Sequence, residues 1–170
     1  MVHLKKRIPG ATTARIERFV RRVCVAAKLK GTVNVLITTN VEMRSLNRRF
    51  CGKDSATDVL SFPAAQGAAG KLLPGKLAGD LAISAEIAAE NAKQLGHAVA
   101  DEIRILILHG VLHLAGYDHE TDRGTMARKE GRLRRELKLP VALIARSRIE
   151  RSKIAQPSEW EARPARKRKA

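Results

Sequence analysis

The segment from about Val99 to Leu114 constrains the fold more than any other part of the sequence, because it is apolar nearly all round. A helix with no polar face for solvent has to be buried, so this pattern is typical of a central core helix. Two histidines, His109 and His113, interrupt it at a spacing of four, which places them on one face of a helix. We therefore expect both imidazoles to lie half inside the protein.

Apolar periodicity, together with cap and turn residues, predicts the elements around this helix. The first predicted elements are a helix begun by Thr12 or Thr13 and stopped by Gly31, a strand over 32–39, and a short basic helix from a cap at Asn40 through Arg49. Strands over 57–62 and 77–84, joined as a hairpin, come next, and an alanine-rich helix follows between Ser84 and Gly96. After the core helix, we expect an amphipathic helix that is capped by Asp122 and ends near Pro140. The predicted fold class is α+β, a small mixed β-sheet of about four strands packed with about five helices.

A chain of 170 residues fits one ordinary domain. We expect this domain to span residues 1–145 and a basic, partly disordered extension to cover 146–170. The longest apolar run, Ile105 to Ala115, is well short of the roughly 20 residues of a membrane span, so no transmembrane helix is expected. The first residues lack the apolar stretch of a signal peptide, which favours a cytoplasmic location. Two cysteines, Cys24 and Cys51, are too few for a disulfide framework and are expected as free thiols.

The charge of the chain indicates a polyanionic partner. Its 33 Lys and Arg residues against 17 Asp and Glu residues give a net charge of +16 and a pI near 10.8. Residues 146–170 account for +6 of this, so the predicted domain is itself basic. Aromatic residues make up only 3% of the chain, which disfavours a base-stacking platform and favours contacts to phosphates. The alternative is that the charge only confers solubility.

A third histidine turns the core pair into a candidate metal site. His119 follows the turn residue Gly116, which allows the chain to bend back toward His109 and His113. Three imidazoles with a fourth position open are the ligand set of catalytic zinc, and a zinc-bound water there has its pKa lowered to ~7. Two core histidines without any metal are the alternative. The third histidine favours the metal, since it completes a three-ligand set. Buried imidazoles without partners would also cost roughly 1–3 kcal/mol each, and a bound metal removes this cost. The predicted domain is therefore a metallo-hydrolase-like catalytic domain with its zinc site at the end of the core helix.

The ligand spacing matches that of the metzincin peptidases, which carry a glutamate directly after the first histidine as general base. Here that position is Gly110. Glu102 lies roughly 10 Å back along the helix, too far to replace the missing base, and we expect it to be a structural hydrogen-bond acceptor. A peptidase or other zinc hydrolase is thus a disfavoured alternative.

The segment HGVLHLAGYDH (109–119), supported by GKDSATDVLSFP (52–63), LAGDLAIS (77–84), Met126 and Glu130, resembles the YbeY family of bacterial metal-dependent endoribonucleases and rRNA maturation factors over about residues 30–140. The resemblance implies an α+β fold with one Zn²⁺ per chain on His109, His113 and His119. It also implies single-strand-specific cleavage of RNA phosphodiester bonds, with a role in 16S rRNA 3′-end maturation and ribosome quality control. The implied partners are ribosomal RNA, the small ribosomal subunit, ribosomal proteins and assembly factors, and no membrane.

One position departs from the family pattern. The family's block resembles Tyr-Arg-Gly-Lys-Asp, with the arginine regarded as functional, whereas residues 50–54 read Phe-Cys-Gly-Lys-Asp, so Cys51 occupies the place of the arginine. A guanidinium there can stabilise charge at a scissile phosphate, and a neutral thiol cannot. Arg48, Arg49 and Lys53 are candidates for the missing phosphate contact. This departure keeps a second hypothesis open, a zinc-containing ribosome-assembly factor that binds RNA without efficient cleavage. A thiolate ligand at Cys51 that closes the metal site is a further, disfavoured alternative.

Three other polar residues have structural interpretations. Asp80 is expected to be a hydrogen-bond partner within a strand rather than a catalytic acid. His97 follows Gly96 at a helix junction and is expected to be a surface or capping histidine. Asp118 either orients a ligand imidazole or only forms the turn.

Overall fold

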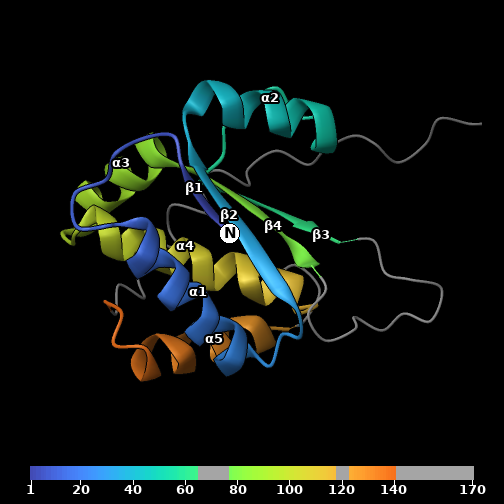
Figure 1. The fold of residues 1–170 in the computed structure, drawn as a ribbon, viewed down its shortest axis with the longest axis vertical. Helices are drawn as coiled ribbons and strands as arrows, with labels where there is room; N and C mark the ends of the chain where they lie inside the picture. Colours follow the sequence, from blue (N-terminus) through green and yellow to red (C-terminus); the bar gives the residue numbers. More distant parts are fainter. Residues whose placement is uncertain (65–76, 118–122, 141–170) are drawn as a thin grey trace, which may run out of the picture.

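The structure, a computed structural model, describes residues 1–64, 77–117 and 123–140. Its elements (Figure 1) are β1 (Val2–Leu4), α1 (Thr13–Ala27), β2 (Thr32–Thr38), α2 (Asn40–Cys51), β3 (Val59–Pro63), β4 (Leu77–Ser84), α3 (Ala85–Leu95), α4 (Val99–Leu114) and α5 (Thr125–Glu136). The predicted extension over 146–170, together with Asp118, His119 and Asp122, lies outside the described residues.

The four strands form one mixed sheet in the order β1-β2-β4-β3. β1 and β4 both pair with β2 in parallel, and β3 pairs with β4 antiparallel. With five helices in the described residues, the predicted α+β class is confirmed. Strand β1 was not predicted, because three residues are too few for an alternating pattern to be recognised.

Helix boundaries follow local capping chemistry. Ser84 caps α3 as predicted, since its hydroxyl accepts a hydrogen bond from the amide of Ile87, and Gly96 ends the same helix in the left-handed region. The predicted cap Asn40 is wrong. Thr39 caps α2 instead, with its hydroxyl accepting from the amide of Glu42, and the helix extends to Cys51 rather than to Arg49. Both threonine and asparagine are good cap residues, so the sequence alone does not separate these neighbours.

Two further helix ends differ from the prediction. Helix α1 ends at Ala27, and the residue that stops it is Lys28, which adopts φ 60°, and not Gly31. The amide of Leu29 closes the turn on the carbonyl of Cys24 at 2.9 Å, and the Leu29 side chain packs against the core, which stabilises the earlier stop. Helix α5 begins at Thr125 with Gly124 at its N-cap position, and the predicted cap, Asp122, lies outside the described residues.

Helix α4 is the central core helix, as predicted. It packs against β3 and β4 on one face of the sheet, and α1, α3 and α5 contact it from its other sides. Helix α2 lies on the opposite side of the sheet from α1, α4 and α5 (Figure 1). The fully buried apolar side chains of α4 are Ile103, Ile105, Leu106, Ile107, Leu108, Val111 and Leu112. They meet Val35, Ile37, Leu81 and Ile83 in the main hydrophobic cluster.

Two glycines allow the last turns of α4 to approach the sheet closely. A Cβ on Gly110 would lie 2.7 Å from Cδ2 of Leu81 and 3.1 Å from Oγ of Ser61. A Cβ on Gly79 of β4 would lie 2.5 Å from the carbonyl oxygen of Phe62 and 2.7 Å from Cδ2 of Leu114. At Gly79 a Cβ would collide with backbone, so this position requires glycine. At Gly110 a Cβ would have to displace the buried side chain of Leu81, so glycine is strongly favoured there. This contact fixes where the end of α4, and with it the two histidines, lies relative to the sheet.

Cys24 and Cys51 are both free thiols, as predicted. Cys24 is buried, and this burial raises the pKa of its thiol. None of the described helices is both long and apolar enough to span a membrane.

Candidate metal centre

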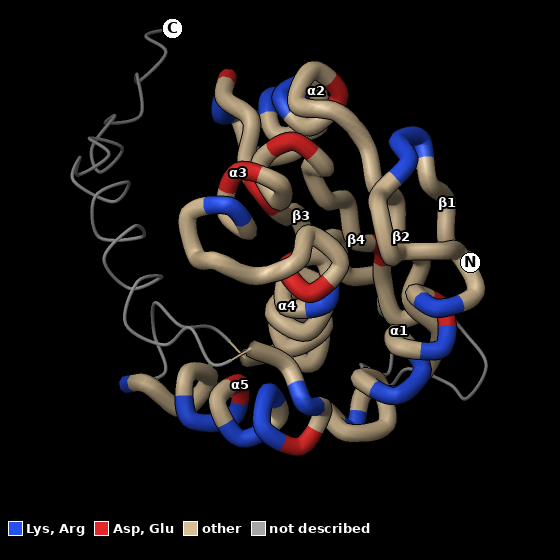
Figure 2. The backbone as a smooth tube through the Cα atoms, turned by 90° about the vertical axis from the view of Figure 1, so that its left-hand side faces the viewer, with Lys and Arg blue, Asp and Glu red and all other residues tan. Residues whose placement is uncertain are grey.

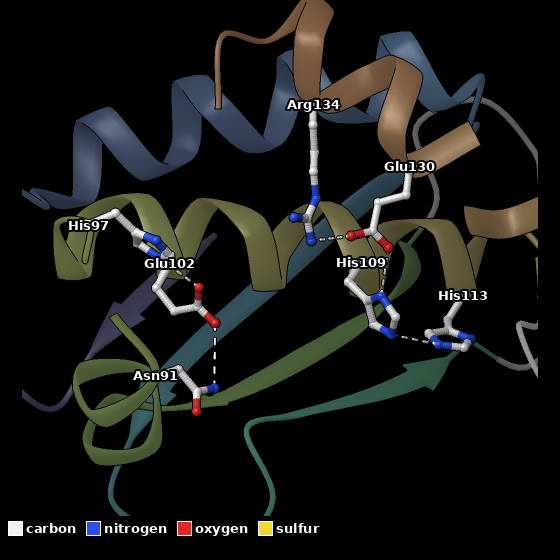
Figure 3. A network of polar contacts seen from close by, with 7 residues as sticks. All are labelled: Asn91, His97, Glu102, His109, His113, Glu130 and Arg134. Atoms are coloured by element: carbon white, nitrogen blue, oxygen red, sulfur yellow. Dashed lines mark hydrogen bonds and ion pairs between the residues drawn. The ribbon is translucent and has the colours of Figure 1, made fainter. Parts of the chain in front are cut away.

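His109 and His113 meet at the end of α4. Their spacing of four brings the two rings to a centroid distance of 4.8 Å and an interplanar angle of 74°. The two Nε2 atoms face each other at 3.1 Å (Figure 3). The prediction that both lie half inside the protein is confirmed, because both residues are partly buried in the core helix. One helix face therefore presents two ring nitrogens to one point in space.

A carboxylate behind the pair orients it. Oε2 of Glu130, on α5, lies 2.9 Å from Nδ1 of His109, and the side chains of these residues are only 13% and 16% exposed. A carboxylate can only accept a hydrogen bond, so Nδ1 of His109 donates to Glu130. In the neutral imidazole, Nε2 then carries the lone pair, on the side of the ring that faces His113. Arg134, one turn further along α5 and with a side chain only 6% exposed, forms an ion pair with the other oxygen of Glu130 (Figure 3). The chain Arg134–Glu130–His109 thus sets both the tautomer and the orientation of the first histidine.

This arrangement fits two ligands of a metal ion. Two nitrogens that each lie about 2.0–2.1 Å from a tetrahedral zinc ion are roughly 3.3–3.4 Å apart, close to the distance between the two Nε2 atoms here. Metal-bound histidines commonly donate their other ring N–H to a carboxylate, which is the contact that Glu130 makes. The third predicted ligand, His119, lies outside the described residues. Within the part of the chain that the structure describes, no cluster of three or more His, Cys, Asp or Glu side chains forms a complete metal site.

The roles of Glu130 and Arg134 are absent from the sequence-based prediction. In the sequence, Glu130 is recognisable only as part of a block that matches the family, and nothing marks Arg134 as functional. The one local signal is their spacing of four on an amphipathic helix, which is typical of an exposed ion pair as much as of a buried one. Their function depends on the packing of α5 against α4, which local periodicity does not predict.

A second polar cluster occupies the other end of α4. The side chain of Glu102 is fully buried, and its oxygens lie 2.9 Å from Nε2 of His97 and 3.4 Å from Nδ2 of Asn91 (Figure 3). The predicted structural role of Glu102 as an acceptor is confirmed. Of the two roles expected for His97, surface or capping, the surface role is wrong, since its side chain is only 7% exposed. Its backbone amide donates to the carbonyl of Ala92 at 3.1 Å and so helps to close the end of α3. The left-handed turn at Gly96 directs His97 back over the first turn of α4, where the buried carboxylate holds it.

The candidate phosphate contacts lie around the C-terminal end of α2. Cys51 is the last residue of α2 and is exposed. The guanidinium of Arg49 stacks over the ring of Phe50 at 5.1 Å, and this ring makes an edge contact with Phe62 of β3. Arg48 and Lys53 flank the same turn. Among the described residues, no hydrogen bond, ion pair or ring contact joins these side chains to His109 or His113, so their part in catalysis stays a prediction.

Asp80 has the structural role expected for it. It lies exposed on β4, and its Oδ1 accepts a hydrogen bond of 2.9 Å from the side-chain amide of Asn34 on β2. This cross-strand pair sits on the face of the sheet opposite α4, because Asn34 and Asp80 are register partners between the buried positions of their strands. Asp80 is therefore not part of the histidine site.

Comparison with known proteins gives one consistent family. The family model described as endoribonuclease YbeY matches residues 4–138. A Koribacter versatilis protein named endoribonuclease YbeY is 50% identical over 156 residues, which cover 92% of this chain and 97% of that protein. Proteins of the same name from Solibacter usitatus and Helicobacter pylori are 50% and 44% identical, over 77% and 68% of this chain and 83% and 77% of their own lengths. A solution structure of a Thermotoga maritima protein has a TM-score of 0.50 at 24% identity, covers 96% of this chain and all of that one, and shows similarity of fold alone.

Proposed function

This chain belongs to the endoribonuclease YbeY family, and on that premise we propose that it is a zinc-dependent endoribonuclease that cuts single-stranded RNA. The observation that carries the proposal is the pair of Nε2 atoms on His109 and His113, 3.1 Å apart, with the carboxylate of Glu130 behind the first ring. A family of enzymes named for RNA cleavage and a site that fits a hydrolytic metal point to the same chemistry.

In this proposal, the histidines are the metal ligands, and Glu130 and Arg134 position them. His109, His113 and, from the sequence, His119 hold one zinc ion. When bound, this ion supplies Lewis-acid activation of the phosphodiester and of water. Glu130 keeps the proton of His109 on Nδ1, so that Nε2 is available as a ligand, and Arg134 holds Glu130 in place. The apolar packing around α4 excludes bulk water from the inner side of the site, which strengthens the electrostatic contacts there.

The proposed substrate is ribosomal RNA. The charge of +16 favours a polyanion, and the described elements carry much of it, since Lys and Arg positions crowd along α1, α2 and α5 (Figure 2). We place the activity at the 3′ end of 16S rRNA, in maturation and ribosome quality control on the small ribosomal subunit in the cytoplasm. Ribosomal proteins and assembly factors are the expected protein partners.

The test is cleavage of a 16S rRNA precursor by the zinc-loaded full chain. A variant with His109, His113 and His119 all changed to alanine is the control. The proposal expects cuts in single-stranded regions with the wild-type protein only. Equal cleavage by both proteins would mean that the histidines are not the catalytic centre, and cleavage of casein by the wild-type protein would favour a peptidase.

A second function is supported by Cys51. This exposed thiol stands where the family pattern has an arginine, which favours a ribosome-assembly factor that holds zinc and binds RNA without efficient cleavage. The structure provides a further argument against the peptidase hypothesis. At Gly110, the position of the peptidase glutamate, even a Cβ would collide with Leu81 of the sheet.

Changing Cys51 to arginine is expected to raise the rate of RNA cleavage by about tenfold or more. One preorganised donor at developing charge is commonly worth about 10²–10³ in rate, and the interaction acts on kcat more than on KM because it strengthens in the transition state. Single-turnover cleavage of a short single-stranded RNA measures the effect, with Cys51→Ser as the matched control that removes the thiol and adds no charge. If Cys51→Arg gives no gain while Arg48→Ala or Arg49→Ala loses activity, an existing arginine already has this role.

A further inference from the structure

A pocket lined by arginines lies away from the histidines. It has a volume of about 280 Å³ and lies between α1, α4 and the residues that follow α5. The residues that line it are Arg15, Arg18, Phe19, Arg22, Arg104 and Leu137. None of them belongs to the metal site or to the C-terminal end of α2.

Three of the four arginines share one face of α1. Arg15, Arg18 and Arg22 are spaced by three and four residues, which aligns them along the helix, and all three are exposed. Arg104 faces them from α4. Phe19 and Leu137 are buried and form the apolar floor. The pocket is therefore a basic rim around a small apolar base.

Few acceptors offset this positive charge. Arg104 bonds to Asp101 at 2.7 Å, and Arg15 donates a long hydrogen bond of 3.4 Å to the carbonyl of Gly10. Across the described residues, no ion pair is recorded for Arg15, Arg18 or Arg22. Like charges at these spacings destabilise a helix, so an anion in the pocket would relieve a repulsion that the fold leaves in place.

The chemistry of the rim selects a phosphate. The planar guanidinium group pairs with two phosphate oxygens at once, and several such groups around one cavity are the usual means of binding phosphates in nucleic acids. The lining offers no carboxylate or amide side chain to read a base, and the ring of Phe19 is buried. The pocket thus suits the sugar–phosphate backbone, without regard to sequence.

The pocket and the metal site occupy different faces of the same helix. Arg104 precedes His109 by five residues, which corresponds to about 7.5 Å along the axis of α4 and roughly 140° around it. Figure 2 shows Lys and Arg positions along both α1 and α5, the two helices that contact α4 around the pocket. A phosphate bound there is not the scissile one.

We propose that the pocket formed by Arg15, Arg18, Arg22 and Arg104 binds a phosphodiester group of the RNA at a distance from the cleavage centre. The identity of the ligand as RNA rests on the proposed function. Free inorganic phosphate offers the same chemistry, so the experiment has to separate these two sources.

The experiment measures binding, not cleavage. The full-length zinc-loaded chain is titrated into a fluorescent, cleavage-resistant 2′-O-methyl RNA single strand at several salt concentrations. In the pocket variant, Arg15, Arg18 and Arg22 are all changed to glutamine, which keeps good helix formers at exposed positions. The matched control changes Arg7, Lys30 and Lys93 to glutamine and removes the same charge from exposed positions elsewhere.

The pocket variant is expected to bind the RNA roughly 10- to 100-fold more weakly at about 0.1 M salt, because each lost phosphate contact lowers the log–log salt slope by roughly 0.7. The control is expected to lose less than about threefold. A variant with lysine at positions 15, 18 and 22 keeps the positive charge but lacks the planar guanidinium groups. Its affinity for the RNA should lie between those of the wild type and the pocket variant. Equal losses in the pocket variant and the control, or an unchanged salt slope in the pocket variant, would overturn the proposal.

A second arm follows the melting temperature of the same proteins in inorganic phosphate. If phosphate stabilises the wild-type chain but not the pocket variant, while both bind RNA equally, the ligand is free phosphate and the RNA assignment is wrong. Failure of the wild-type protein to cut RNA would remove the proposed activity but leave these binding results unaffected. The two proposals can therefore fail separately.

Discussion

Replacing His113 with alanine is expected to remove the bound zinc and to lower RNA cleavage by roughly 10³-fold or more. His113 presents its Nε2 at 3.1 Å from that of His109, so its loss leaves a metal only one of the two described ligands. Elemental analysis of the purified protein gives the zinc content, and single-turnover cleavage of single-stranded RNA gives the rate. The melting temperature should fall as well, because metal binding is coupled to folding.

The control for this substitution is His3→Ala. His3 is an exposed histidine on β1, and within the described residues its side chain forms one hydrogen bond, with the sulfur of Met1. It should keep one zinc per chain and full activity. Full zinc occupancy in His113→Ala would remove this histidine from the metal site, whatever happens to cleavage.

Introducing glutamate at Gly110 is expected to lower the free energy of unfolding by about 4 kcal/mol or more. A Cβ at this position would lie 2.7 Å from Leu81 and 3.1 Å from Ser61, so the side chain would force α4 away from the sheet. Overpacking alone costs roughly 1–3 kcal/mol, and burying an unpaired carboxylate adds several more. The variant restores the residue pattern of the metzincin peptidases, yet we expect no peptidase activity from it. Urea unfolding followed by circular dichroism measures the change.

Gly131→Glu is the matched control. Gly131 also lies inside a helix, but the nearest atom to a Cβ there is Nη1 of Arg135, at 4.0 Å. Glutamate is a far better helix former than glycine, so this variant should be as stable as the wild type or more stable, by up to about 1 kcal/mol. Wild-type stability in Gly110→Glu would show that α4 does not approach the sheet as closely as described.

Much of the fold could be predicted from local patterns. Helix α4 is apolar nearly all round, and this alone places it in the core. Strand β4 and the caps of α3 were predicted because their signals are local and unambiguous. Strand β1 was missed, since its three residues depend on pairing with β2 and carry no pattern of their own.

The metal site was predictable only in part, for a similar reason. The spacing of His109 and His113 is a helix property and is visible in the sequence. The contact between His109 and Glu130 joins residues 21 positions apart and exists only because α5 packs on α4. His97 was misplaced because its burial depends on the carboxylate of Glu102 and not on the polar residues around it.

The most direct test of the proposed function is RNA cleavage by the full-length protein after its metal has been removed and zinc has been returned stepwise. The account predicts no cleavage by the metal-free protein and a recovery that saturates at about one zinc per chain, a stoichiometry that follows from one three-histidine site. His113→Ala should not recover under the same conditions. Undiminished cleavage of single-stranded RNA by the metal-free protein would contradict the account.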